Sequence, residues 1–389
     1  MIIDVTQSHS SILLPYKPKK LAVGEVDVME AIPEKYLKTV VFLCVDEERG
    51  SIKQRIPKAT GFFVRVQIED SLDLQMDYVV TARHCIDEAH QYGQIYIRVN
   101  RNSGSFIEFP TNIDAWYLHD SADVAAIPIL RDDLPVNIQP SDLDTASLKS
   151  SDFVGGAPDY KIVFSPYGKQ HEIQPRVGHQ VYFLGLFTEH YGQEHNLPIA
   201  RFGNISRMPS AVTMIDTLGT KFSVIAYLVE FHSWGGHSGS PVFFLYPIIV
   251  EHVVPLGLTN GNKLDIPVHI ELSWATSFMG LVSGHYDIAK EAQTTGEYYG
   301  HIQTELNSGV AIVTPAIAVT ELLMREDLVQ YRKKLRDIAE SKRPTPTLDI
   351  AGNREAFTQD DFLRDLRKVI PQTESPPHHP TSLSSNSIP

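Results

Sequence analysis

The chain is poor in cysteine. Its 389 residues include only two, Cys44 and Cys85. Two thiols cannot form the several bridges that staple small secreted domains, so a disulfide framework is excluded and we expect a reducing, cytoplasmic location. A single Cys44–Cys85 bridge stays open, because the sequence does not fix the distance between the two sulfur atoms.

Basic residues and long hydrophobic runs are also scarce. Lysine and arginine number 34 against 47 acidic residues, for a formal net charge of −13, whereas nucleic-acid binding requires clustered cations. The longest apolar runs, such as residues 241–250, have about ten residues, roughly half of what a bilayer core requires. Residues 1–20 place no basic segment ahead of their apolar stretch, unlike a secretory signal. We therefore expect no nucleic-acid partner, no membrane span and no signal peptide.

Short segments rich in β-branched and aromatic residues recur as far as about residue 320. They are bounded by turn residues and do not alternate with helical patterns, which indicates an antiparallel all-β sandwich or barrel. They occupy residues 39–45, 59–68, 77–82, 94–99, 123–129, 180–187, 222–231, 240–245, 278–284 and 309–315. A segment of lower order at 140–160 predicts a division into two β units.

The pattern changes after Pro315. Residues 316–342 place Ile317, Leu322, Leu328 and Leu335 at helical spacing with charged residues between them, which predicts one amphipathic helix. Prolines just after residue 342 end that helix. In the tail, 343–389, we expect a short helix within 357–370 and a disordered Pro/Ser-rich end.

One segment, WGGHSGSPVFF (234–244), encloses a serine, Ser238, between Gly236 and Gly239. A plain surface turn is one interpretation. A nucleophilic serine is the other, and it requires a histidine base and a carboxylate that orients the base. His84 at the end of a strand-like run and Asp123 at the head of an apolar one are the candidates, with Asp120 and Asp87 as alternative acids.

Residues 189–195 gather side chains that can bind metals, namely His190, Glu194 and His195. Their spacing does not match a structural zinc site. We interpret them as a solvated loop and expect no metal and no cofactor.

Three segments, VVTARHC (79–85), DVAAIPI (123–129) and GGHSGSPVFF (235–244), together resemble the catalytic segments of the chymotrypsin/trypsin-like serine peptidases. Their order of His, Asp and Ser is that family's, whereas subtilisins and α/β-hydrolases use other orders. The GxSGSP pattern resembles the bacterial and intracellular branch. The resemblance implies that His84 is the general base, that Asp123 orients it and that Ser238 attacks the acyl carbon. It also implies an oxyanion hole from the N–H groups of Gly236 and Ser238.

The same resemblance implies a fold. It predicts two antiparallel six-stranded β-barrels, the first at about 36–140 and the second at about 161–315, with a closing C-terminal helix at 316–342. The peptidase domain then spans residues 36–325 and follows an N-terminal extension, 1–35.

Substrate contacts follow from the resemblance as well. Val282, Ser283 and Gly284 correspond to the edge strand that pairs with an extended peptide, and residues 255–261 are an alternative edge. His232 and Ser233 fall at the floor of the specificity pocket, where neither supplies the carboxylate that selects Lys or Arg.

Two departures from the family matter. Digestive members have an acid before the serine that receives a newly cut N-terminus, and this chain has His237 there, so we expect a site that forms without cutting and a histidine that supports the loop. Cys85 follows the base as in extracellular members. Its usual partner position holds Ala59 or Thr60, so that disulfide is missing.

The resemblance thus predicts a serine endopeptidase that cleaves polypeptides through an acyl-enzyme. The alternative is a catalytically silent scaffold that binds peptides or acts as a sensor. In either case the tail, 343–389, is a candidate docking element for a regulatory protein.

Overall fold

The computed structural model describes the chain between residues 32 and 342 with several gaps. The described ranges are 32–50, 52–71, 74–130, 133–154, 174–215, 221–231, 236–257, 263–291 and 303–342. Most of the predicted N-terminal extension and the whole tail, 343–389, with its predicted short helix and disordered end, lie outside them. Within these ranges, none of the helices has the length and apolar character to cross a membrane.

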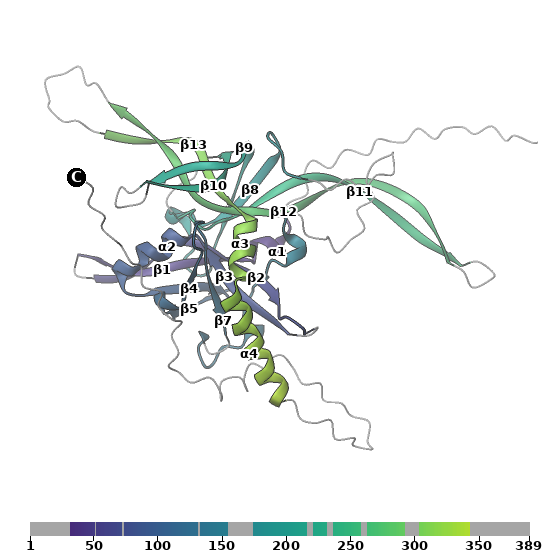
Figure 1. Ribbon diagram of the computed structural model, residues 1–389, viewed down its shortest axis with the longest axis horizontal. Coiled ribbons are helices and arrows are strands. Elements are labelled where there is room, and N and C mark those ends of the chain that lie inside the picture. Colours follow the sequence, from purple (N-terminus) through teal and green to yellow (C-terminus); the bar gives the residue numbers. More distant parts are fainter. Residues whose placement is uncertain are drawn as a thin grey trace, which may run out of the picture.

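The first β unit is an antiparallel sheet of seven strands in the order β5-β4-β1-β2-β3-β7-β6 (Figure 1). The strands are β1 (Val40–Arg49), β2 (Ile52–Gln67), β3 (Gln75–Thr81), β4 (Ile95–Asn100), β5 (Phe106–Thr111), β6 (Tyr117–Leu118) and β7 (Ala125–Ile129). Helix α1 (Glu34–Leu37) precedes β1, and α2 (Arg83–Ala89) follows β3. The side chains of β1 from Val40 to Val45 are all buried, as a continuous apolar run predicts for a strand covered on both faces.

This unit differs from the predicted six-stranded barrel. Strands β5 and β6 form its two edges and are joined by a tight 3₁₀ turn, Ile113–Ala115. The hydrogen bonds of the turn stay within it and its neighbours. Trp116 donates its backbone N–H to the Ile113 carbonyl oxygen and its indole N–H to the Thr111 hydroxyl. The two edges are therefore connected through this turn rather than by a ladder of backbone hydrogen bonds.

The second β unit is a closed barrel of six strands, which confirms the prediction. Its order is β10-β13-β12-β11-β8-β9. The strands are β8 (Gln180–Gly185), β9 (Ile199–Ile215), β10 (Lys221–Glu230), β11 (Pro241–Gly257), β12 (Lys263–Glu291) and β13 (Gln303–Pro315).

Strands β11 and β12 continue far beyond the barrel wall. β8 pairs with β11 only at Val242–Phe244, whereas β11 and β12 stay paired from Pro241 and Leu281 as far as Gly257 and Lys263. The result is the two-stranded ribbon that projects from the body in Figure 1.

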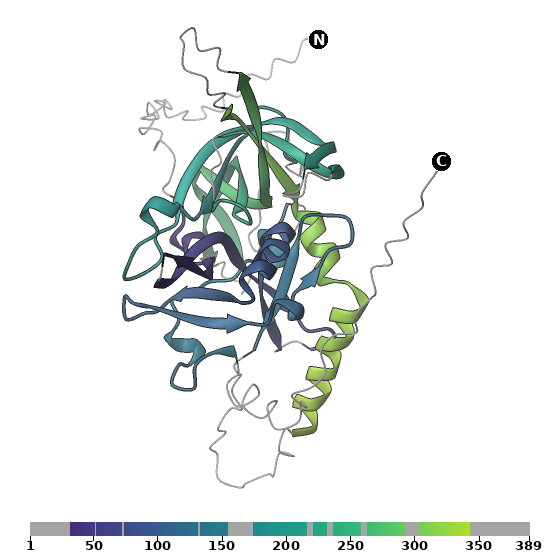
Figure 2. The ribbon, with the colours of Figure 1, turned by 90° about the vertical axis from the view of Figure 1, so that its left-hand side faces the viewer.

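The C-terminal helical segment is two helices, α3 (Ala316–Leu323) and α4 (Glu326–Lys342), so the prediction of one continuous helix was wrong. Arg325 lies between them, and its guanidinium binds the Leu118 carbonyl oxygen of the first β unit at 2.8 Å and the Asp327 carboxylate. Asp327 also accepts the N–H of Leu328, and acids in its first turn favour a new helix start. Figure 2 shows α3 starting where the two β units meet and α4 continuing alongside the first unit.

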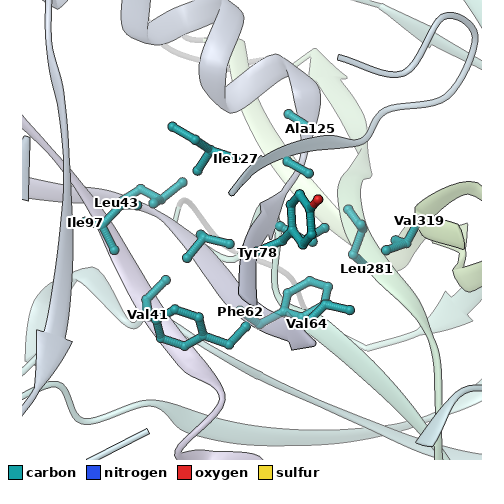
Figure 3. Close-up of a cluster of buried hydrophobic side chains, with 14 of the residues drawn as sticks. Val41, Leu43, Phe62, Val64, Tyr78, Ile97, Ala125, Ile127, Leu281 and Val319 are labelled. Atoms are coloured by element: carbon teal, nitrogen blue, oxygen red, sulfur yellow. The ribbon is translucent and has the colours of Figure 1, made fainter. Parts of the chain in front are cut away.

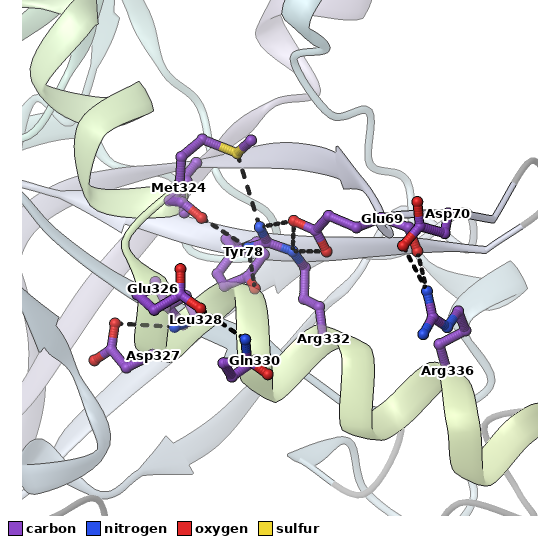
Figure 4. A network of polar contacts seen from close by, with 11 residues as sticks. Glu69, Asp70, Tyr78, Met324, Glu326, Asp327, Leu328, Gln330, Arg332 and Arg336 are labelled. Atoms are coloured by element: carbon purple, nitrogen blue, oxygen red, sulfur yellow. Dashed lines mark hydrogen bonds and ion pairs between the residues drawn. The ribbon is translucent and has the colours of Figure 1, made fainter.

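One buried arginine anchors α4 to the first sheet (Figure 4). Arg332 is fully buried, and its guanidinium binds the Glu69 carboxylate, the Tyr78 hydroxyl at 3.2 Å and the Leu323 carbonyl oxygen at 2.7 Å. A buried charge is tolerated when it is paired and its donors are bound, as they are here.

The hydrophobic core of the first unit continues into the rest of the chain. Figure 3 shows Phe62 and Tyr78 of the first sheet near Leu281 of β12 and Val319 of α3. All four side chains belong to one buried cluster and are 0% exposed. Burial of this shared core fixes the two units against each other at the place where the candidate site lies.

Candidate functional site

The Ser238 loop lies between β10 and β11 and depends on its glycines. Gly236 and Gly239 have φ of +96° and +81°, the left-handed region that other residues rarely adopt. A Cβ on Gly239 would lie 2.1 Å from the Thr60 carbonyl oxygen and 2.2 Å from Thr81 Oγ1. The loop is thus a tight turn that also presses against β2 and β3, with the Ser238 side chain half-buried.

His84 and Asp123 meet as the sequence predicts, although His84 comes from a different element. His84 lies in the first turn of α2 and not at the end of a strand, because the chain leaves β3 at Thr81. Asp123 lies just before β7. Its carboxylate oxygens receive the His84 backbone N–H at 2.9 Å and contact His84 Nδ1 at 2.9 Å.

The alternative acids do not take this place. Asp87 pairs with Arg83 at 3.3 Å, and Asp120 is exposed. Only the Asp123 carboxylate, among the described residues, binds the His84 ring.

The contact between His84 and Asp123 stabilises the charged forms of both side chains, the protonated imidazole and the ionised carboxylate. Burial, the largest single influence, would lower the pKa of His84, but the negative charge of Asp123, the hydrogen bond to it and the contact with Cys85 together outweigh burial and raise that pKa well above the usual value. Burial alone would raise the pKa of Asp123. The charge of His84 and the hydrogen bonds from its ring, its backbone N–H and the Ser283 hydroxyl hold that pKa below its usual value.

Ser283 and Val282 have roles that the sequence analysis did not assign. Ser283 is 2% exposed, its hydroxyl lies 2.6 Å from Thr314 Oγ1, and its polar side chain helps to lower the pKa of Asp123. Val282 accepts the Gly239 N–H at 2.8 Å and donates its own N–H to the Ser240 carbonyl oxygen at 2.9 Å. Both backbone groups of Val282 therefore bind the serine loop, and the predicted pairing of Val282 with a peptide stays a prediction.

The remaining predicted substrate contacts have other outcomes. Gly284 pairs with Ile312 of β13, so its proposed contact with a peptide stays a prediction. His232 and Ser233 lie outside the described residues. The alternative edge, 255–261, is described only to Gly257, where it pairs with β12 in the projecting ribbon.

Thr60 of β2 links the serine loop to the segment that leads to His84, and no sequence signal indicated it. Its N–H donates to the Ser238 carbonyl oxygen at 3.0 Å, and its hydroxyl donates to the Gly236 carbonyl oxygen at 2.8 Å. Its own carbonyl oxygen accepts the Thr81 hydroxyl at 2.7 Å. Because Thr81 is three residues before His84, these bonds place the serine loop beside the start of α2.

The Ser238 hydroxyl and the Nε2 atom of His84 are not hydrogen-bonded to each other in the structure. Among the described residues, the Ser238 hydroxyl makes no hydrogen bond, and the polar neighbour of His84 Nε2 is the Cys85 sulfur at 3.7 Å. Catalytic hydrogen bonds are often long in unliganded enzymes and tighten with substrate. Within the described ranges, no backbone carbonyl accepts the N–H of Gly236 or of Ser238.

His237 is buried beneath the serine loop. It is fully buried and its ring packs against Phe183 with centroids 4.8 Å apart. Burial, aided by the charges of Arg201 and His285, lowers the pKa of His237 to about 3. The ring is therefore neutral at ordinary pH and offers no charge to a chain terminus.

The two cysteines are both free and buried, so the bridge left open by the sequence is not formed. No group of three or more potential metal ligands occurs in the described ranges. His190, Glu194 and His195 lie in the β8–β9 loop.

Comparisons with known proteins give only distant likenesses. No family model and no curated protein matches the sequence. Among solved structures, the MamO protease domain from Magnetospirillum magneticum is similar with a TM-score of 0.35 and 14% identity, over 75% of this chain and 98% of that one. The active form of Rv3671c protease from M. tuberculosis gives 0.35 and 15%, over 75% and 81%. A tobacco etch virus protease mutant gives 0.32 and 10%, over 77% and 83%.

Proposed function

We propose that the chain is a serine endopeptidase that cleaves polypeptides through an acyl-enzyme. The observation that carries the proposal is the double contact of His84 with Asp123. A carboxylate bound to Nδ1 keeps the ring proton there and leaves Nε2 as the base. The half-buried Ser238 lies in the adjoining loop and supplies the nucleophile.

The reaction proceeds in two halves. The Ser238 hydroxyl gives its proton to His84 Nε2 as its oxygen bonds to the peptide carbonyl carbon. The N–H groups of Gly236 and Ser238 stabilise the oxyanion. His84 then protonates the leaving amine and the C–N bond breaks. A water molecule, deprotonated by His84, then attacks the ester carbonyl carbon. The bond from that carbon to the Ser238 oxygen breaks, His84 returns the proton to this oxygen, and the acid is released.

A second function, a silent scaffold that binds peptides, has one observation in its favour: Ser238 is not hydrogen-bonded to His84. Such a scaffold would bind peptides with both residues in place but would never acylate. We also propose a cytoplasmic location, which two free thiols support, and a regulatory protein that docks on the tail, 343–389.

Cleavage of a mixed peptide library, read by mass spectrometry, tests the proposal. We expect Ser238→Ala to reduce cleavage by at least about a thousandfold. Ser240→Ala is the matched control, because that side chain is fully buried and its hydroxyl makes no hydrogen bond among the described residues. Cleavage by Ser238→Ala at the rate of the Ser240→Ala control would refute the assignment, and binding of peptides without cleavage by the parent protein would favour the scaffold.

A further inference from the structure

The loop that carries Asp123 is built around one histidine. His119 Nδ1 accepts the backbone N–H groups of Ser121 at 3.1 Å and of Ala122 at 3.0 Å. The His119 backbone N–H closes the loop on the Val124 carbonyl oxygen at 2.9 Å. The ring is therefore a template for the three residues that precede Asp123, and its side chain is only 12% exposed.

The other ring nitrogen of His119 reaches the C-terminal helices. Two N–H groups on Nδ1 assign the ring proton of the neutral form to Nε2. Nε2 lies 3.3 Å from the Glu321 carboxylate of α3. Next to this contact, Arg325 binds the Leu118 carbonyl oxygen at 2.8 Å. The loop is thus attached to a helix whose other face is buried in the core.

The loop is also attached to the helix of the base. Arg83 donates to the His119 carbonyl oxygen at 2.9 Å, and Arg83 directly precedes His84. A displacement of the loop would change both contacts of Asp123 with His84 at once.

We propose that His119 is a positioning residue for Asp123, and that Glu321 extends this support to α3. The proposal rests on the proposed function for its kinetic consequences but not for its structural ones. Asp123 binds two groups of His84 at 2.9 Å. Displacement of a catalytic group by about 1 Å costs about a hundredfold in rate, so a loop that lacks its template should orient the base poorly.

The test compares His119→Ala with His119→Asn. The amide oxygen of asparagine can take the place of Nδ1 and accept the same two N–H groups, whereas alanine leaves them without an acceptor. We expect His119→Ala to lower kcat by about a hundredfold with little change in KM, and His119→Asn to recover most of this loss. Glu321→Ala should cost about threefold, the effect of a half-exposed pair. His90→Ala, at an exposed histidine on another element, is the control.

A spectroscopic measurement separates this proposal from the proposed function. The proton between His84 Nδ1 and Asp123 should give a far-downfield NMR signal in the parent protein whether or not peptides are cleaved. We expect this signal to be lost or shifted in His119→Ala and retained in His119→Asn. An unchanged signal in a folded His119→Ala protein, or equal damage from both variants, would overturn the proposal. If His119→Ala does not fold, the downfield signal is compared between His119→Asn and Glu321→Ala. Loss of the signal in His119→Asn would overturn the proposal. A signal that is retained in His119→Asn and weakened in Glu321→Ala would support the proposal.

Discussion

Replacing His237 by glutamine should flatten the dependence of stability on pH in weakly acidic solution. The folded pKa of His237 is about 3, against 6.5 for an ordinary histidine. Below about pH 6.5 the unfolded chain takes up a proton that the folded chain does not, so stability is lost as pH falls. Each pH unit costs about 1.4 kcal/mol, which gives about 2 kcal/mol at about pH 5.

The assay is urea unfolding followed by tryptophan fluorescence at a series of pH values. The quantity compared is the unfolding free energy of the parent minus that of the variant, so that the contributions of other groups cancel. For His237→Gln this difference should fall by about 2 kcal/mol between about pH 7 and about pH 5. His195→Gln, at an exposed histidine, is the control. A difference that stays constant for His237→Gln would refute the reasoning that burial keeps this ring neutral.

Three further predictions concern single side chains. Asp123→Asn should lower the rate of cleavage by about 10⁴, and the loss of its charge should let the pKa of His84 fall, so the acidic limb of the kcat/KM profile should move to lower pH. Gly239→Ala should cost more than about 2 kcal/mol in urea unfolding, and clearly more than Gly104→Ala, which has a similar φ of +80° but open space around its Cα. Glu69→Ala should cost about 3–5 kcal/mol in the same assay, because it leaves the buried arginine of α4 without its carboxylate; a loss under about 1 kcal/mol would contradict that.

Parts of the site could be predicted from the sequence because they depend on local patterns. The glycines around Ser238 mark a turn that needs left-handed backbone, and the structure places Gly236 and Gly239 there. The acid at the head of an apolar run requires a buried partner, and Asp123 has one in His84. In both cases the cost of a strained or desolvated group is visible in its immediate neighbours along the chain.

Other features depend on contacts between distant segments and leave no local pattern. Ser283 of β12 lowers the pKa of Asp123 although 160 residues separate the two in the sequence. Thr60 looks like any strand threonine, and its contacts to Gly236 and Ser238 lie more than a hundred residues away. Arg332 is buried in the core, whereas the spacing of apolar residues along the helix predicts burial only for apolar side chains. The break between α3 and α4 likewise lies at Arg325, whose guanidinium binds the first β unit.

Labelling with a fluorophosphonate, followed by mass mapping of the adduct, tests the central claim most directly. The probe reacts only with a serine that a base has activated, and it needs no knowledge of the substrate. We expect one adduct, on Ser238, in the intact protein without prior proteolysis, and its loss in both Ser238→Ala and His84→Ala. Absence of an adduct on the folded parent protein, or labelling of Ser238 that persists at the same rate in His84→Ala, would contradict the claim that these residues form a working catalytic site.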